Sequence, residues 1–295
     1  MSMPAGEPCD YEVAPDMTLR GERFGSPQAP PLVLLHGGGQ TRHAWGEAGP
    51  ALARRGWQVL AIDQRGHGES DWSEFERYGF EHYVDDFLRV LATLPQPPVL
   101  IGASLGGLVG LLAQGERSEP LLRALVLVDI VPDMSMRGRE RVHRFMLGRQ
   151  AGFATLDEAA QAVADYLPQR RRPTDREGLL KNLRQRPDGR WYWHWDRRLM
   201  EVLTRNPLDA GRLRGAAAAL RLPTLLVRGA LSDIVTPEAA QAFLELVPHA
   251  EFTEVEGAGH MVAGDRNDVF LDAVTAFLER FEASPDSAAA PRAGR

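Results

Sequence analysis

The most specific chemical signal in the sequence is a G-x-S-x-G pentapeptide at residues 102–106, centred on Ser104. The pentapeptide follows a run typical of a buried strand and precedes an apolar run typical of a helix, which is the setting of a nucleophile elbow. Glycines flank the serine because such a turn is sharp and leaves little room for side chains. The pattern predicts that Ser104 is a nucleophile. It also predicts that the amide of Leu105, at a helix N-terminus, stabilises developing negative charge. The competing interpretation, a turn without chemistry, is disfavoured by this strand-turn-helix context.

A serine hydroxyl needs a general base, and His260 is the best candidate. It lies in a glycine-rich loop after the strand-like run 251–255. Asp233 follows the strand-like run 224–227 and is predicted to orient the histidine, in the chain order Ser, Asp, His. Asp129, at the end of the run LVLVD, is a second candidate for this acid. We favour Asp233 and assign Asp129 to the start of an insertion.

A second source of oxyanion donors is the run HGGG at residues 36–39. Its glycines allow the backbone to approach a substrate closely and to direct N–H groups toward it. We expect Gly38 or Gly37 to supply the second oxyanion donor, and His36 to brace the loop. The competing interpretation is a flexible loop that caps a helix.

The elements that must position these residues alternate between strand and helix. This alternation predicts an α/β fold with a doubly wound, mostly parallel sheet. Thr236 and Pro237 supply a capping hydroxyl and a proline at the first helical position, which marks one helix start. The predicted strands cover residues 32–35, 57–62, 99–102, 124–128, 224–227 and 251–255, and the predicted helices 82–94, 105–114, 238–246 and 267–281.

The alternation is interrupted between residues 132 and 213, where arginine and aromatic residues dominate and helical patterns cover 139–150 and 156–166. We interpret 132–213 as a helical cap inserted into a core formed by 19–131 and 214–282. Residues 1–18 are expected to be a flexible N-terminal segment. Residues 283–295 contain no aromatic or β-branched residue and are expected to be a disordered tail.

The cap contains the aromatic run WYWHWD at residues 191–196. Some of these rings must be buried, either to pin the cap to the core or to line an apolar substrate pocket. Trp193 and Trp195 are the candidates for the pocket. The arginines at 170–172, with Arg184 and Arg186, have two interpretations, a solvated surface or a site that attracts an anionic substrate.

These motifs resemble those of the α/β-hydrolase superfamily, in the branch with a helical cap and a serine nucleophile. The segment DQRGHGES at residues 63–70 resembles the D-x-R-G-x-G-x-S loop of that branch, which is structural. The resemblance implies a serine hydrolase that cleaves a carboxylic ester, thioester or lactone of a small to medium apolar substrate through an acyl-enzyme on Ser104. The alternatives are a cofactor-free perhydrolase or haloperoxidase with the same triad, a ligand-binding receptor on this scaffold, and acyl transfer to an alcohol or amine.

Composition excludes several other classes of protein. The 295 residues include 34 Lys and Arg against 40 Asp and Glu, a formal net charge of −6 that does not suit a nucleic-acid partner. No apolar run is long enough for a membrane helix, and Cys9, the single cysteine, cannot form an intrachain disulfide. Residues 1–16 lack the features of a signal peptide, so a cytoplasmic location is expected. Neither a metal motif nor a dinucleotide fingerprint is present, so we expect no cofactor, no metal and a small-molecule ester or lactone as partner. The sequence leaves the oligomeric state open.

Overall fold

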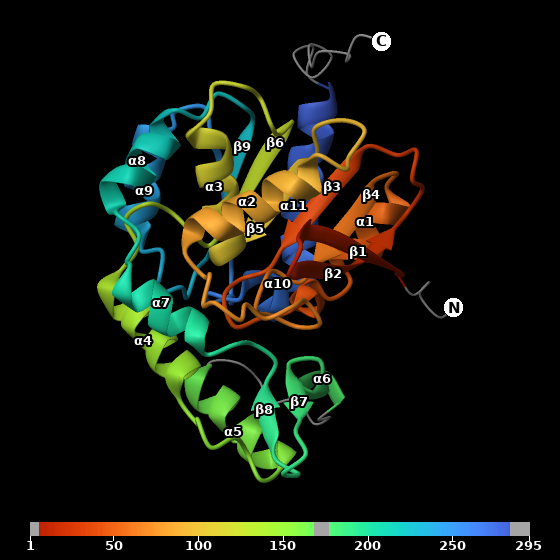
Figure 1. Cartoon of the computed structure of the whole chain (residues 1–295). Helices are drawn as coiled ribbons and strands as arrows, with labels where there is room; N and C mark the ends of the chain where they lie inside the picture. The colour runs from red at the N-terminus through yellow and green to blue at the C-terminus, as the bar shows by residue number, and fades with distance from the viewer. Residues whose placement is uncertain (1–5, 168–176, 284–295) are drawn as a thin grey trace.

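The computed structural model describes residues 6–167 and 177–283 and contains an eight-stranded, mostly parallel sheet (Figure 1). The strand order is β1-β2-β4-β3-β5-β6-β9-β10, and every pair from β4 to β10 is parallel. The predicted α/β architecture is confirmed. The strands are β1 (Glu7–Ala14), β2 (Met17–Phe24), β3 (Pro31–Leu35), β4 (Gln58–Ile62), β5 (Val99–Ala103), β6 (Ala124–Val128), β9 (Thr224–Gly229) and β10 (Glu251–Val255).

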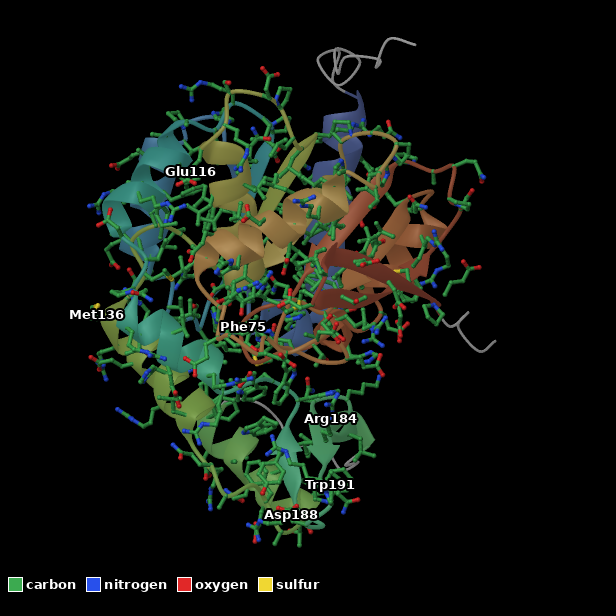
Figure 2. The ribbon with its side chains drawn as sticks, in the orientation of Figure 1. Phe75, Glu116, Met136, Arg184, Asp188 and Trp191 are labelled. Carbon is green, nitrogen blue, oxygen red and sulfur yellow. The ribbon has the colours of Figure 1, made fainter. Side chains whose placement is uncertain are left out.

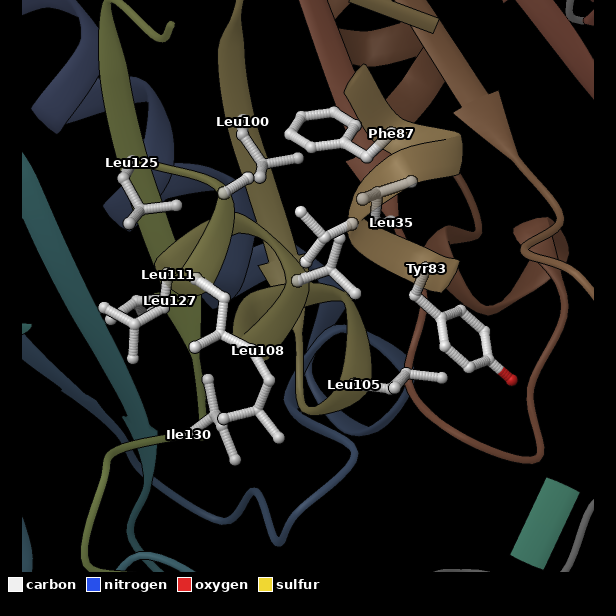
Figure 3. Packing of buried hydrophobic residues seen from close by; sticks show 14 of the residues in the cluster. Leu35, Tyr83, Phe87, Leu100, Leu105, Leu108, Leu111, Leu125, Leu127 and Ile130 are labelled. Carbon is white, nitrogen blue, oxygen red and sulfur yellow. The ribbon is translucent and has the colours of Figure 1, made fainter. Parts of the chain in front are cut away.

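Helices cover both faces of the sheet because its central strands are apolar on both sides. All five residues of β3 and of β6 are buried. One face packs against α1 (Ala48–Arg54) and α11 (Asn267–Ala283). The other face packs against α2 (Phe80–Leu91), α3 (Leu105–Gly115), α8 (Ala210–Ala218) and α9 (Pro237–Leu246), and Figure 3 shows part of this cluster. Thr236 caps α9 as predicted, because its side chain accepts a hydrogen bond from the amide of Ala239 at 3.2 Å.

The expectation that residues 1–18 form a flexible segment is wrong for the residues of this segment that the structure describes. Residues 7–14 form β1, which pairs antiparallel with β2, and β2 pairs antiparallel with β4. This hairpin extends the sheet at one edge. Only residues 1–5 of the expected segment lie outside the described residues.

The predicted insertion lies between β6 and β9 and forms a cap on one side of the core (Figure 1). Its helices agree with the prediction, but the cap is not wholly helical, since the run WYWHWD contributes a strand of a two-stranded hairpin. Residue spacing explains the difference, because alternating aromatics have the period of a strand. The cap elements are α4 (Met136–Leu147), α5 (Leu156–Tyr166), α6 (Glu177–Leu180), β7 (Leu183–Gln185), β8 (Trp191–Trp193) and α7 (Arg198–Arg205).

The limits of the insertion also need a correction at its C-terminal end. A side-chain carbon on Gly115 of α3 would lie 2.2 Å from the carbonyl oxygen of Ala216 in α8. This helix begins at Ala210, so residues 210–213, which the prediction assigns to the cap, form the first turn of a helix packed on the core. Of the expected tail, Ala283 is the last residue of α11, and 284–295 lie outside the described residues.

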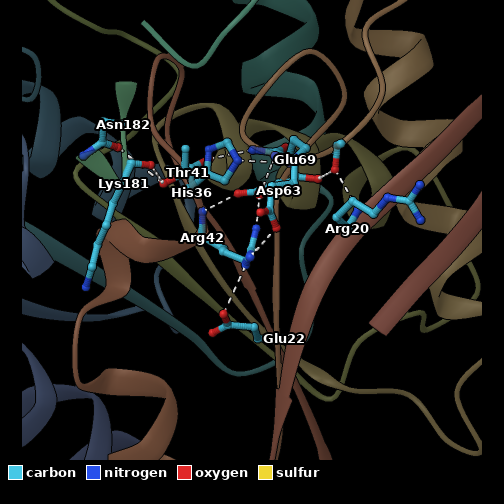
Figure 4. Close-up of polar contacts among 11 residues, drawn as sticks. Arg20, Glu22, His36, Thr41, Arg42, Asp63, Glu69, Lys181 and Asn182 are labelled. Carbon is cyan, nitrogen blue, oxygen red and sulfur yellow. Dashed lines mark hydrogen bonds and ion pairs between the residues drawn. The ribbon is translucent and has the colours of Figure 1, made fainter. Parts of the chain in front are cut away.

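The cap is joined to the core by backbone hydrogen bonds to the 63–70 loop. The amide of Gly68 donates to the carbonyl of His194, and the amide of Asp196 donates to the carbonyl of Gly66, both at 2.7 Å. This loop is held in turn by Asp63, which is fully buried and pairs with Arg42 (Figure 4). The 63–70 loop is therefore structural, and it fixes one side of the cap.

Candidate active site

Ser104 occupies a strained turn between β5 and α3. Its φ is +45°, a region that residues other than glycine rarely adopt. A side-chain carbon on Gly102 would lie 2.5 Å from the carbonyl oxygen of Gly106, and one on Gly106 would lie 2.2 Å from the carbonyl oxygen of Leu35. Both glycines are therefore required by the close approach of neighbouring backbone, as the pentapeptide predicts.

His260 pairs with Asp129 at the carboxyl edge of the sheet. The distance between His260 Nδ1 and Asp129 Oδ2 is 2.8 Å. Asp129 directly follows β6, has a φ of +51° and is fully buried. Its Oδ1 accepts a hydrogen bond from the amide of Gly229 at 3.0 Å, and its Oδ2 accepts one from the hydroxyl of Ser232 at 2.5 Å. The carboxylate is thus held by three donors, of which His260 is one.

The predicted acid, Asp233, is not the partner of His260, and the prediction is corrected to Asp129. Asp233 Oδ2 lies 3.2 Å from Nε of Arg141 on the cap helix α4, and about a third of the side chain is exposed. The loop after β9 directs Ser232, the preceding residue, toward Asp129 instead. The sequence signal that could have favoured Asp129 was its place directly at the end of a fully buried strand.

Ser104 and Asp129 follow the adjacent strands β5 and β6, and His260 lies in the loop after β10, which is separated from β6 by β9. The amide of Ser104 donates to the carbonyl of Val128, the residue before Asp129, at 3.1 Å. The loop that carries His260 crosses close to the end of β9, since a side-chain carbon on Gly229 would lie 2.2 Å from the carbonyl oxygen of Gly259. The structure contains no hydrogen bond between the described side chains of Ser104 and His260. Such contacts are often long before substrate binds.

The three glycines of the HGGG run differ in the hydrogen bonds that their amides donate. The Gly37 amide donates to Oε1 of Gln40 at 2.8 Å, and the Gly39 amide donates to Nε2 of His67 at 3.1 Å. The prediction that Gly37 can be an oxyanion donor is therefore wrong, because its only N–H already donates to Gln40. The Gly38 amide has no hydrogen-bond partner within residues 6–167 and 177–283. Leu105 is the first residue of α3, so its amide has no partner within that helix.

Two buried neutral histidines support the glycine run. Burial lowers the pKa of His36 to about 4 and, with the nearby His36 ring, lowers the pKa of His67 to about 3. His36 Nε2 accepts a hydrogen bond from the amide of Gln64 at 3.0 Å, so the proton on this ring is at Nδ1, which faces the carbonyl of Gly37 at 2.8 Å. His67 Nδ1 faces the carbonyl of Arg65 at 2.9 Å in the same way. Both rings brace the loop, as expected for His36.

An aromatic cluster connects the cap to this region. Trp193 and Trp195 stack with ring centroids 4.9 Å apart and an angle of 9°. Phe145 of α4 lies 5.4 Å from the ring of Trp193 and stacks at 4.2 Å on the ring of Tyr166. Trp195 is 4% exposed and belongs to the core, so it pins the cap. Trp193 is partly exposed and is the better candidate to line a pocket.

The cap arginines that the structure describes make ring contacts near the surface. Arg186 lies 4.1 Å from the ring of Tyr192, and Arg184 lies 6.0 Å from the ring of Trp72. Figure 2 shows Asp188 and Trp191, near Tyr192 in sequence, at the end of the cap remote from the core. Residues 170–172 lie outside the described residues.

Two other kinds of feature are absent from the described ranges. Residues 6–167 and 177–283 contain no group of three or more His, Cys, Asp or Glu side chains placed to hold a metal ion. None of the helices in these ranges is both long enough and apolar enough to cross a membrane.

Comparison with known proteins connects this geometry to a family. Residues 30–266 match the family model described as the alpha/beta hydrolase fold. Esterase Rv0045c of Mycobacterium tuberculosis is 30% identical over 269 residues, which cover 87% of this chain and 85% of the esterase. The mouse sn-1-specific diacylglycerol lipase ABHD11 is 29% identical over 271 residues, covering 86% of this chain and 82% of the lipase.

Solved structures agree with the sequence comparison. The crystal structure of E-2-(acetamidomethylene)succinate hydrolase superposes with a TM-score of 0.80 at 25% identity and covers 93% of this chain and 99% of its own. A structure of the M. tuberculosis esterase Rv0045c gives a TM-score of 0.75 at 26% identity, covering 95% and 94%. The chain therefore belongs to the α/β-hydrolase family and is a hydrolase consistent with the carboxylic-ester type.

Proposed function

We propose that the chain is a serine hydrolase that cleaves a carboxylic ester, thioester or lactone of a small to medium apolar substrate. The observation that carries the proposal is the pairing of His260 with the buried carboxylate of Asp129, beside the strained turn that presents Ser104. The relatives named as an esterase and a lipase support ester hydrolysis.

The hydrogen-bond pattern supports a role for His260 as general base. Asp129 Oδ2 is a carboxylate oxygen, so it accepts the Nδ1 proton of His260. Nε2 then carries a lone pair and takes the proton of Ser104 as the serine oxygen attacks the carbonyl carbon. The resulting imidazolium is stabilised by the carboxylate and later protonates the leaving group. Water then attacks the acyl-enzyme with the same groups in reversed roles.

We assign the stabilisation of the negative charge that forms on the carbonyl oxygen in the transition state to the amides of Leu105 and Gly38. Leu105 lies at the N-terminus of α3, where backbone donors and the helix dipole favour negative charge. Gly38 is the one residue of the glycine run whose amide has no partner in the described chain. Preorganised donors of this kind contribute roughly 10² to 10³ in rate each.

The apolar preference is assigned to the cap. A side-chain carbon on Gly38 would lie 3.8 Å from Sδ of Met146 in α4, so the cap helix covers the loop that holds the oxyanion. Phe145 and Trp193 of the cap, whose ring centroids lie 5.4 Å apart, are partly buried and pack against the same apolar cluster as Met146. Apolar side chains beside the oxyanion loop suit an acyl chain better than a charged group.

The test compares hydrolysis of p-nitrophenyl acetate, butyrate and octanoate by the wild type and by Ser104→Ala. We expect turnover by the wild type, loss of turnover in the variant, and an unchanged melting temperature. Labelling by a fluorophosphonate, followed by mass spectrometry of the peptide that carries Ser104, provides a readout independent of the ester chosen. Turnover or labelling that persists in Ser104→Ala would refute the proposal. Peroxide-dependent halogenation without ester hydrolysis would instead identify the perhydrolase alternative.

A further inference from the structure

The side chain of Gln40 closes a ring around Gly37 at the start of the oxyanion loop. Its Oε1 accepts the Gly37 N–H at 2.8 Å, and its own backbone amide donates to the Gly37 carbonyl at 3.2 Å. The turn between them contains Gly39 with a φ of +72°. Gly37 is thus held at both its amide and its carbonyl by one residue three positions later.

This ring lies against the proposed nucleophile. A side-chain carbon built on Gly37 would lie 2.9 Å from Gln40 Oε1 and 3.3 Å from Ser104 Cβ. The carboxamide of Gln40 and the Cβ of Ser104 therefore approach the same side of the Gly37 backbone. Gln40 is only partly exposed, so its carboxamide is an ordered part of the loop and not a solvated surface group.

This arrangement determines which of two adjacent amides, that of Gly37 or that of Gly38, can donate to the oxyanion. A glycine backbone is free to rotate, and an unengaged Gly37 N–H would compete with Gly38 for the same negative charge. The side-chain oxygen of Gln40 accepts the Gly37 N–H, so this amide is no longer available to the substrate. The Gly39 amide is likewise unavailable, because it donates to Nε2 of His67 at 3.1 Å. Of the three glycine amides, that of Gly38 is without a hydrogen-bond partner among the residues that the structure describes, so it is available to the substrate.

We infer that Gln40 is a positioning residue for acyl transfer, which orients the Gly38 amide toward the oxyanion by holding the Gly37 amide. The inference rests on the proposed function and adds a residue that the nucleophile, base and acid do not include. Gln40 acts through the loop and does not itself touch the reacting atoms.

The test is steady-state kinetics of Gln40→Met, which preserves side-chain length but lacks the acceptor. We expect kcat to fall on the order of 10- to 100-fold, less than the loss of an oxyanion donor itself, with KM changed by less than about two-fold. An arylboronic acid forms a tetrahedral adduct on a serine and places an oxygen in the oxyanion site. Its inhibition constant should rise by the same factor by which kcat/KM falls, because both report the same tetrahedral geometry.

Thr41→Val is the matched control on the same loop. The Thr41 hydroxyl lies 3.3 Å from two acceptors in the cap, the Lys181 carbonyl and Oδ1 of Asn182, and its one proton is available to either, so the variant loses a contact of the loop without freeing Gly37. Its kcat should stay within about two-fold of the wild type. If Gln40→Met does not fold, Gln40→Asn, whose carboxamide is one methylene too short, replaces it with the same expected loss.

The outcomes separate this inference from the proposed function. Turnover that survives Ser104→Ala refutes the proposed function, whatever Gln40 does. Turnover that depends on Ser104 but is unchanged in Gln40→Met overturns only the role of Gln40. Equal losses in Gln40→Met and Thr41→Val, or a rise in KM without a fall in kcat, also overturn it, because general disorder of the loop would then explain the effect.

Discussion

Replacing Asp129 by asparagine tests which carboxylate serves His260. The carboxamide introduced by Asp129→Asn has one acceptor oxygen and cannot accept from all three donors that surround the carboxylate, which are Gly229, Ser232 and His260. The Oδ1 position faces the Gly229 amide at 3.0 Å and requires an acceptor, so the amide oxygen takes this place. The amide nitrogen then faces His260 Nδ1 and donates to it. The histidine proton is forced to Nε2, where no lone pair remains to accept the proton of Ser104.

The magnitude follows from this tautomer argument. The corresponding replacement in a serine protease leaves the geometry intact and lowers kcat about 10⁴-fold, which corresponds to about 5.5 kcal/mol of transition-state stabilisation. We expect a loss of that order for Asp129→Asn. Asp233→Asn breaks an ion pair with Arg141 that is about one-third exposed. Such pairs contribute about 0 to 1 kcal/mol, so kcat/KM should change by less than about five-fold.

The assay is the initial rate of p-nitrophenyl butyrate hydrolysis by the two variants and the wild type, with melting temperatures measured on the same samples. Asp233→Asn is the matched control, since both changes convert an aspartate that follows a parallel strand. A larger loss of kcat in Asp233→Asn than in Asp129→Asn, with both variants folded, would refute the assignment of the acid and restore the one based on sequence.

Three further predictions concern the supports of the site. Ser232→Ala removes a hydroxyl donor to a buried carboxylate and should lower the free energy of unfolding by about 1.5 to 3 kcal/mol in urea titrations; no change would show that the 2.5 Å contact is not stabilising. The pKa of His67 is lowered to about 3, so below about pH 6.5 the unfolded chain binds the proton first. The stability from this group then falls by about 1.4 kcal/mol per pH unit as the pH drops from about 6.5 to about 3. His67→Gln should reduce the pH slope of stability by about one proton, and an unchanged slope would contradict the burial argument. Gly106→Ala places a carbon 2.2 Å from a main-chain oxygen of β3 and should lower the free energy of unfolding by about 3 kcal/mol or more. Gly215→Ala, a control with open space around the added carbon, should leave the free energy of unfolding unchanged or raise it slightly. Equal effects of the two substitutions would contradict the steric account of the elbow.

Sequence reasoning succeeded where a single local pattern determines the structure. The buried run at β5, the pentapeptide and the apolar start of α3 form one continuous signal, and the observed element boundaries lie within a residue of those predicted. The N-terminal hairpin was missed because an edge strand needs few apolar residues. Val13 is the one buried residue of β1, so the segment lacks the signature of a buried strand.

The place of Asp129 directly after β6 is a sequence signal in its favour, but the choice of acid depends on side-chain direction, which the sequence does not determine. Asp129 and Asp233 both follow parallel strands at the same edge of the sheet. The turn at Ser232 decides between them. The Ser232 hydroxyl accepts hydrogen bonds from the amides of Ile234 and Val235 at 3.2 Å, and the resulting turn directs the Asp233 side chain away from His260. The availability of Gly37 depends likewise on a side chain three residues away, which a glycine pattern does not report.

The attachment of the cap to the core has a consequence for engineering by domain exchange. The segment from His194 to Asp196 is bonded to the loop that carries His67, and His67 in turn engages Gly39 beside the oxyanion donor. A chimera that receives the cap of a relative would therefore exchange the substrate pocket and a support of the catalytic loop together. Its substrate range and its turnover number should change in concert unless residues 194–196 are kept from the recipient.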